Sequence, residues 1–297
     1  MQVAMNSRSI TSSLAAFAAS STSSLLPGKR QLLLFTVAGV AFALGTAAQA
    51  AVVDLTFLNA SGSIGQATFT QFDPQSTGTG VFDAFAQISP GGSATTSSGY
   101  NTTSNGVFDG GSSDQHNRSI LLSDVPVING SRRFVLDINE VNSQGNQFLS
   151  LDQVLLYVGG NANPSTTNLS DAALGTLVYS MNAIGSSTNV VGLNYALNPG
   201  SGAGDMFMTL SETLFAGFAP SSVVTLYSAF GGLGTLTAGN SFNLPAGVYG
   251  QSDGFEEWGA PGARSTVPDG GSTIALMGGA LLFLAGLARR GILVAGI

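Results

Sequence analysis

Few residues in this chain could do chemistry, and their types exclude several reaction classes. The 297 residues contain no cysteine and a single histidine, His116. A thiolate nucleophile, a cysteine zinc site and a multi-histidine metal site are therefore excluded. A Ser-His-Asp triad would have to use His116, because the chain has no other histidine. We interpret His116 as a solvated loop residue and predict no catalytic residue.

Carboxylates are the remaining candidates for catalysis. Glycoside hydrolysis uses a pair of carboxyl groups that flank the scissile bond. The chain has four glutamates, Glu140, Glu212, Glu256 and Glu257, and their spacing alone selects no pair. A surface glycoside hydrolase is therefore a third hypothesis, behind the two classes below.

Oxygen ligands for calcium are a better-supported site. Calcium binds carboxylate, amide and carbonyl oxygens supplied by loops and strand ends. The predicted ligands lie at facing ends of the strongest predicted strand pair, 133–139 and 148–158: Asp137, Asn139, Glu140 and Asp152. The acidic runs 109–114 and 253–257 are further candidates, although none matches the EF-hand pattern. The alternative is that these acids cap turns and strand edges through backbone hydrogen bonds.

Aromatic residues offer a second kind of binding surface. Trp258, beside two glutamates, and Tyr100, in a polar segment, could stack on sugar rings. Packing against the protein core is the alternative for both.

Charge and composition narrow the class of protein. Charged residues make up 8% of the chain, against about 25% in ordinary soluble domains. Residues 51–266 contain fifteen acids and four arginines, a net charge of −11, which excludes nucleic acid as a partner. The 40 glycines and many neutral polar residues are typical of turn-rich β proteins.

Alternating apolar residues predict the elements that would position these side chains. Short strands separated by Gly, Asn and Pro turns indicate an all-β fold, an antiparallel β-sandwich or jelly-roll-like ectodomain over residues 51–264. The segment 148–158 places Leu149, Leu151, Leu155 and Tyr157 on one face, and its second half is apolar on both faces, which predicts a central strand. The run 211–216 predicts one helical turn, with Ser211 or Thr209 as its cap, and residues 90–111 predict a long loop. The main strands are expected at 51–58, 64–72, 81–88, 133–139, 148–158, 174–181, 190–197, 205–210 and 223–230.

The N-terminal segment reads as a secretory signal peptide, residues 1–50. Lys29 and Arg30 precede an apolar run, and Ala48-Gln-Ala50 follows it as an A-x-A cleavage site. Cleavage is expected after Ala50, and a retained membrane anchor is the alternative.

The C-terminal segment, residues 265–297, predicts a transmembrane helix. Residues 270–288 carry no charge and would span about 28 Å as a helix, close to the hydrocarbon thickness of a bilayer. Arg289 and Arg290 follow and favour a cytoplasmic C-terminus. The preceding domain is then expected outside the cytoplasm.

These terminal residues carry a resemblance to a known family. A Val-Pro-Asp-Gly-Gly-Ser turn, an apolar helix and a pair of arginines resemble the PEP-CTERM sorting signals of Gram-negative bacteria, most closely the Val-Pro-Asp-Ser-Gly variant. The ectodomain resembles those of such proteins at segments including 121–126, 136–140 and 253–258. The residues of the predicted sorting motif are Val267, Pro268, Asp269, Gly270, Gly271, Ser272, Arg289 and Arg290.

The resemblance implies an address rather than a reaction. It implies that an exosortase processes the tail and that the cargo reaches the cell envelope, often with exopolysaccharide. We therefore expect a non-enzymatic envelope or matrix protein exported by the Sec route and transiently anchored in the inner membrane. Its expected partners are an exosortase, the inner membrane and exopolysaccharide. A calcium- or carbohydrate-binding surface module is the alternative.

Overall fold

The computed structural model describes residues 50–71, 83–110, 116–200 and 204–261. The predicted sorting tail and all of the predicted signal peptide except Ala50 lie outside these residues. The described part is all-β, as predicted, and its helical segments are 3-10 turns of three or four residues. None of its helices is long and apolar enough to cross a membrane.

One sheet, here called sheet A, is built around the strand β9. Its strands pair antiparallel, except at one edge, where β1 and β11 run parallel. All eleven residues 148–158 of β9 are buried, so the predicted central strand is confirmed. The path of sheet A is β1 (Val52–Asp54), β11 (Val190–Asn194), β9 (Phe148–Gly159), β13 (Val223–Phe230) and β5 (Ser97–Tyr100), with β10 (Gly175–Ser180) beside β9 and β6 (Ile120–Leu121) beside β13.

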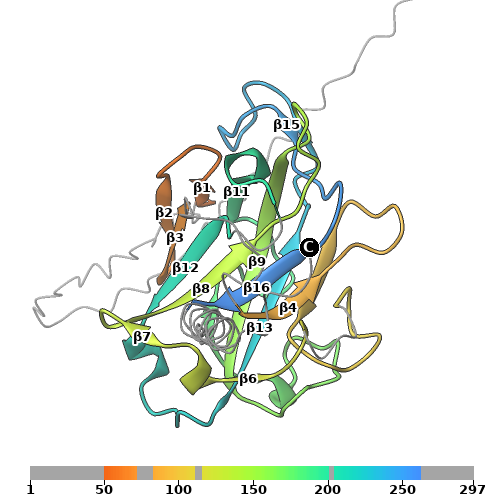
Figure 1. Cartoon of the computed structure of the whole chain (residues 1–297). Helices are drawn as coiled ribbons and strands as arrows, with labels where there is room; N and C mark the ends of the chain where they lie inside the picture. The colour runs from red at the N-terminus through yellow and green to blue at the C-terminus, as the bar shows by residue number, and fades with distance from the viewer. Residues whose placement is uncertain (1–49, 72–82, 111–115, 201–203, 262–297) are drawn as a thin grey trace, which may run out of the picture. The chain divides into compact units, whose positions relative to one another are not determined.

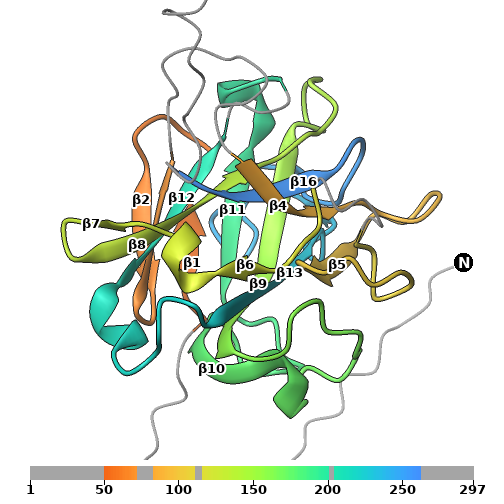
Figure 2. The same cartoon turned by 60° about the horizontal axis from the view of Figure 1, so that its bottom comes forward.

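The other seven-stranded sheet, sheet B, is antiparallel throughout. Its path is β2 (Ser61–Ile64), β3 (Ala67–Gln71), β12 (Met206–Ser211), β8 (Ser131–Asp137), β16 (Glu256–Ala260) and β4 (Asp83–Ile88), with β7 (Val127–Ile128) beside β8. A two-stranded ribbon, β14 (Thr235–Leu236) and β15 (Gly247–Val248), forms a third sheet. Figures 1 and 2 show β8, β12 and β16 lying across the long strands β9 and β13.

The two large sheets enclose one hydrophobic core. Phe134 and Leu136 from sheet B and Leu149 and Leu151 from sheet A belong to the same buried cluster. Trp258 of β16 joins the sheets directly, because its indole Nε1 donates to the Ser228 Oγ of β13 at 2.9 Å. The core therefore depends on contacts between segments far apart in the sequence.

The two strands with the strongest sequence pattern do not form a pair. We expected the ends of 133–139 and 148–158 to face each other within one sheet, but β8 belongs to sheet B and β9 to sheet A. Their inner faces meet across the core instead. Alternation indicates which face is buried but not which strand is the neighbour, and this is why the pairing was wrong.

A β-bulge in β9 corrects a second expectation. We predicted Leu149, Leu151, Leu155 and Tyr157 on one face, but the last two belong to a separate cluster on the other side of sheet A. Ala229 of β13 pairs with Gln153 and Phe230 pairs with Leu151, so Asp152 is the extra residue. One extra residue reverses the alternation that follows it.

Other element boundaries differ in both directions. β13 coincides with the predicted strand, and a helical turn forms at Glu212–Phe215 within the predicted run. Of the two predicted cap residues it is Ser211 that caps this turn, accepting a hydrogen bond from the Thr213 backbone amide. The expected strand 64–72 is a hairpin of β2 and β3, and β8 ends at Asp137 rather than at Asn139. β5 lies within residues 90–111, which were predicted to form a loop. β16 overlaps the run 253–257, which we interpreted only as a candidate binding site.

Candidate functional site

Buried carboxyl groups gather around β16 at the end of β8. Glu256 and Glu257 are neighbours in sequence, so they point to opposite faces of sheet B. Glu257 lies opposite Gln87 of β4 and Asp137 of β8, so these three side chains share a face. β16 therefore places one carboxyl group on each side of the sheet.

The Glu257 side includes the single histidine. The carboxylate accepts a hydrogen bond from Gln87 Nε2 at 3.1 Å and lies 3.8 Å from His116 Nδ1. Burial raises the pKa of Glu257, and a positive charge on His116 opposes that rise. His116 is half-exposed, and it contacts a buried acid rather than a serine. His116 and Glu257 therefore form a polar pair at the surface of sheet B rather than part of a Ser-His-Asp triad.

Glu140 and Glu256 form the other group. Glu256 is fully buried, and its carboxylate accepts hydrogen bonds from Gln251 Nε2 at 2.9 Å and from the Asn139 amide at 3.1 Å. Glu140 Oε2 accepts from both the amide and the hydroxyl of Ser252, each at 2.6 Å. Burial raises the pKa of Glu140 to about 7, and burial and the Glu140 charge raise that of Glu256 well above its usual range.

Two aspartates extend the acidic region along β8 and β12. Asp205 Oδ2 accepts a hydrogen bond from the Ile138 amide at 2.8 Å, and Asp137 Oδ1 accepts from the Gly204 amide at 3.0 Å. Burial, and then the charge of Asp137, raise the pKa of Asp205 well above its usual range. The fold thus holds several acids in a region of low polarity, an arrangement that favours their neutral forms or a bound cation.

A polar hollow of about 480 Å³ borders this region. Gln251, Ser252 and Asp253 form part of its wall, and the segments 89–90 and 92–95 form another part. Gln251 and Ser252 are also the residues that hydrogen-bond Glu256 and Glu140. Two residues of the wall of the hollow therefore contact two buried carboxyl groups directly.

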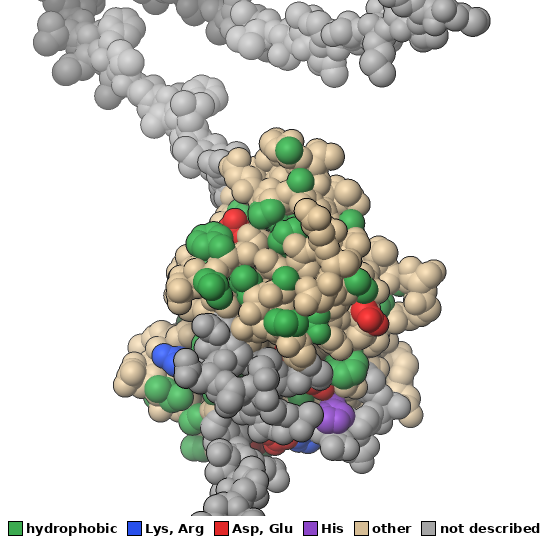
Figure 3. Space-filling model, turned by 45° about the horizontal axis from the view of Figure 1, so that its top comes forward, with side chains coloured by type: hydrophobic (Ala, Val, Ile, Leu, Met, Phe, Trp, Pro, Cys, Tyr) green, Lys and Arg blue, Asp and Glu red, His purple; other side chains and the backbone are tan. Residues whose placement is uncertain are grey.

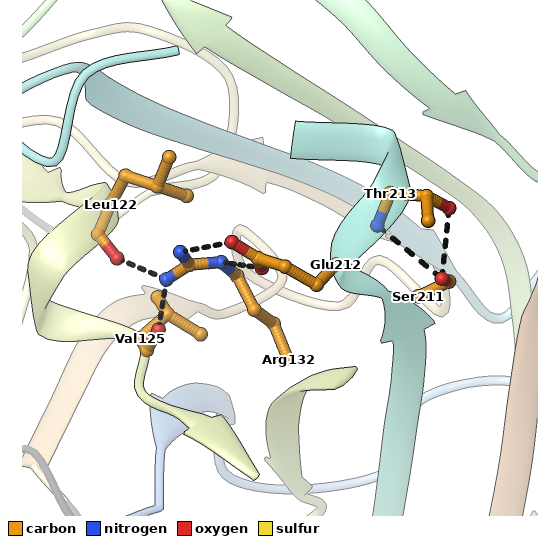
Figure 4. A network of polar contacts seen from close by, with 6 residues as sticks. All are labelled: Leu122, Val125, Arg132, Ser211, Glu212 and Thr213. Carbon is orange, nitrogen blue, oxygen red and sulfur yellow. Dashed lines mark hydrogen bonds and ion pairs between the residues drawn. The ribbon is translucent and has the colours of Figure 1, made fainter. Parts of the chain in front are cut away.

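Glu212 belongs to a different, structural network, shown in Figure 4. Arg132 Nε and Nη2 donate to the two carboxylate oxygens of Glu212 at 2.6 and 2.9 Å. Arg132 Nη1 also donates to the carbonyl oxygens of Leu122 and Val125. Arg132 thereby ties the 3-10 turns at Leu122–Asp124 and Glu212–Phe215 to β8, and Glu212 is accounted for without catalysis.

Neither aromatic side chain proposed for sugar stacking is exposed. Trp258 and Tyr100 both have no exposed surface. Trp258 lies in the core between the sheets, and the Tyr100 hydroxyl donates to the carbonyl oxygen of Thr166 at 2.7 Å. Packing, the alternative interpretation, is correct for both rings.

The predicted calcium ligands are only partly brought together. Asp137 and Glu140 lie at the end of β8, whereas Asp152 accepts hydrogen bonds from Gly232 and Ser150 at the bulge of β9. Asn139 lies beyond the end of β8, and its backbone amide donates a hydrogen bond to Glu256. Among the described residues, no three acidic or histidine side chains already converge as metal ligands. Calcium binding by the predicted set stays a prediction.

Sequence reasoning missed Asp205 and Gln251. Both lie in segments where neither alternation nor a motif marks a site, and their importance comes from long-range neighbours such as Ile138 and Glu256. Only the strand pairing reveals them.

The exposed surface carries little charge. Figure 3 shows a face on which backbone and uncharged polar side chains (tan) predominate, with scattered hydrophobic and few charged side chains. Comparison of the chain with protein families, with curated proteins and with solved structures finds no match in any of the three.

Proposed function

We propose that this chain is a non-enzymatic protein of the cell envelope or extracellular matrix, a β-sandwich exported by the Sec route and sorted by an exosortase. The observation that carries the proposal is the sequence of features in the tail, where Val267-Pro-Asp269 precedes an uncharged run and an arginine pair. The basic-apolar segment that ends at Ala50 supports export. Association with exopolysaccharide follows from the same resemblance.

The fold is compatible with this role. Cysteine is absent, so stability outside the cytoplasm has to come from packing, and the two sheets supply a large core. A surface of neutral polar groups suits contact with hydrated polysaccharide.

Localisation of tail variants tests the proposal. Deletion of residues 267–297 should convert an envelope-retained protein into a freely secreted one. Replacing Val267, Pro268 and Asp269 by alanine keeps the apolar run and should leave the chain membrane-bound but unprocessed. Unchanged localisation and processing in both variants would refute the sorting role.

A further inference from the structure

We propose that the hollow beside β16 binds a divalent cation, with Ca²⁺ as the best fit, through Glu140, Gln251 and Asp253. This inference is independent of the sorting proposal, because it rests only on residues 89–95, 139–140 and 251–256. The main predicted calcium set shares Glu140 with this site, and Asp253 comes from the further candidate run 253–257.

The first support is a surplus of hydrogen-bond acceptors. Gln251 is 3% exposed and Glu140 is 3% exposed, yet Gln251 Oε1 and Glu140 Oε1 have no hydrogen-bond partner among the described residues. The Gln251 amide donates its Nε2 to Glu256, so the oxygen is the atom left over. Two buried acceptors without a donor need a cation or a proton to offset their desolvation.

The second support is the local charge. Glu140 interacts with the charges of both Glu256 and Asp253. The ion pairs of the described residues involve other acids, namely Asp83, Glu212 and Glu257. Among the described residues, therefore, no basic side chain forms an ion pair with Glu140, Asp253 or Glu256.

The third support is access. Gln251, Ser252 and Asp253 form part of the wall of the 480 Å³ hollow, so an ion can approach these residues from solvent. Glu140 lies behind this wall, where it accepts two hydrogen bonds from Ser252. The Asp253 side chain is exposed, and its Oδ1 accepts a hydrogen bond from the Gly254 backbone amide at 2.8 Å. Because three carboxylates do not yet converge, binding requires Asp253 to turn toward Glu140, with water completing the shell.

Calcium suits these ligands better than its competitors. It accepts six to eight oxygen ligands in flexible geometry, including amide oxygens and water, whereas Mg²⁺ demands a regular octahedron. Zinc favours nitrogen and sulfur ligands, and none is present in this group. Extracellular sites of this type have Kd values of about 0.1–1 mM.

Calcium titration of the full chain in detergent micelles tests the site, by calorimetry and by thermal melting with CaCl₂, MgCl₂ or EGTA. We expect Ca²⁺ to bind and, at 100 times its Kd, to raise the Tm by about 5 °C or more. Asp253→Asn changes an exposed residue and should weaken binding at least tenfold, as should Glu140→Gln. Asp171→Asn, at the rim of another hollow, is the matched control and should bind normally.

Two results would overturn the proposal. One is the absence of Ca²⁺ binding up to about 10 mM, in which case protons alone neutralise the group. The other is binding that Asp253→Asn and Glu140→Gln leave unchanged, which would place the ion elsewhere. Asp253→Asn keeps the test decisive if Glu140→Gln fails to fold.

Discussion

Asp152 shows how one residue can carry both a structural and an electrostatic role. It is the extra residue of the β9 bulge, and its Oδ2 accepts hydrogen bonds from the Gly232 amide at 2.6 Å and from Ser150 Oγ at 3.3 Å. These donors hold the carboxylate where the strand changes face. Burial nevertheless raises the pKa of Asp152 to about 6.

The raised pKa predicts a pH-dependent cost to folding. Below about pH 3 the carboxyl group is neutral in both states, and between about pH 4 and 6 the unfolded chain ionises while the folded chain stays protonated. The free energy of unfolding should therefore fall across this window. Asp152→Asn keeps an acceptor but no charge, so its stability relative to wild type should be about 2–3 kcal/mol greater at pH 8 than at pH 3. Urea denaturation in EDTA measures this, and equal pH profiles would contradict it.

Arg132 and Glu212 should contribute unequally to stability although they form one ion pair. The Arg132 side chain is 10% exposed and holds two backbone carbonyl oxygens, whereas the Glu212 side chain is 39% exposed. Arg132→Met should lower the free energy of unfolding by about 2–4 kcal/mol, because it leaves buried carbonyl oxygens unpaired. Glu212→Gln should cost about 1 kcal/mol or less. Similar losses in chemical denaturation would show that the ion pair, rather than the carbonyl contacts, dominates.

At the scale of elements, close backbone approach fixes the wall of the hollow. Gly231 follows β13 with a φ of 84°, and a Cβ atom there would lie 2.1 Å from the Thr95 carbonyl oxygen. That oxygen accepts a hydrogen bond from the Gln251 amide at 2.8 Å. The end of β13, the segment before β5 and the segment before β16 are therefore locked together at one point.

A pair of glycine variants separates backbone strain from this contact. Gly231→Ala should lower the free energy of unfolding by about 3 kcal/mol or more, because it adds a clash to an unfavourable φ. Gly234→Ala also has a positive φ, 58°, but its Cβ would meet open space, so about 1 kcal/mol is expected. Thermal unfolding of both proteins provides the comparison. A loss at Gly231 no larger than at Gly234 would mean that the contact yields easily.

Elements were predicted from the sequence where a local pattern was sufficient. The all-β class, the central position of β9, the bounds of β13 and the Ser211 cap follow from alternation and capping chemistry within a few residues. Neighbours across the sheets did not follow, because pairing depends on competing long-range contacts. β5 is Ser-Ser-Gly-Tyr, which has no strand signal, and its pairing with β13 and its hydrogen bonds to Asp109 hold it in place. The acidic region was missed in part for the same reason.

At the scale of the whole molecule, Trp258 connects the two sheets. It is the only tryptophan in the chain, is fully buried, and donates to Ser228 on the opposite sheet. Trp258→Phe should lower the free energy of unfolding by about 2–4 kcal/mol, since it leaves a cavity and an unpaired hydroxyl group.

The same residue reports whether the sheets unfold together. Because its surroundings come from both sheets, tryptophan fluorescence and far-ultraviolet circular dichroism should lose their native signals at the same denaturant concentration. A fluorescence transition at lower denaturant would show that the sheets separate before their strands are lost.

The place of β16 has a consequence for the order of assembly. This last described strand is not at an edge: it lies between β8 and β4, so β4 has no neighbour in sheet B until residues 256–260 arrive. A chain that emerges from its N-terminus, from a ribosome or through a translocation pore, must therefore hold β4 without its strand partner for about 170 residues of synthesis, although Gly110, Asn117 and Arg118 already contact β4. Sheet B can be completed only after β16 has emerged. Any chaperone that protects the unfinished sheet therefore has to act until then.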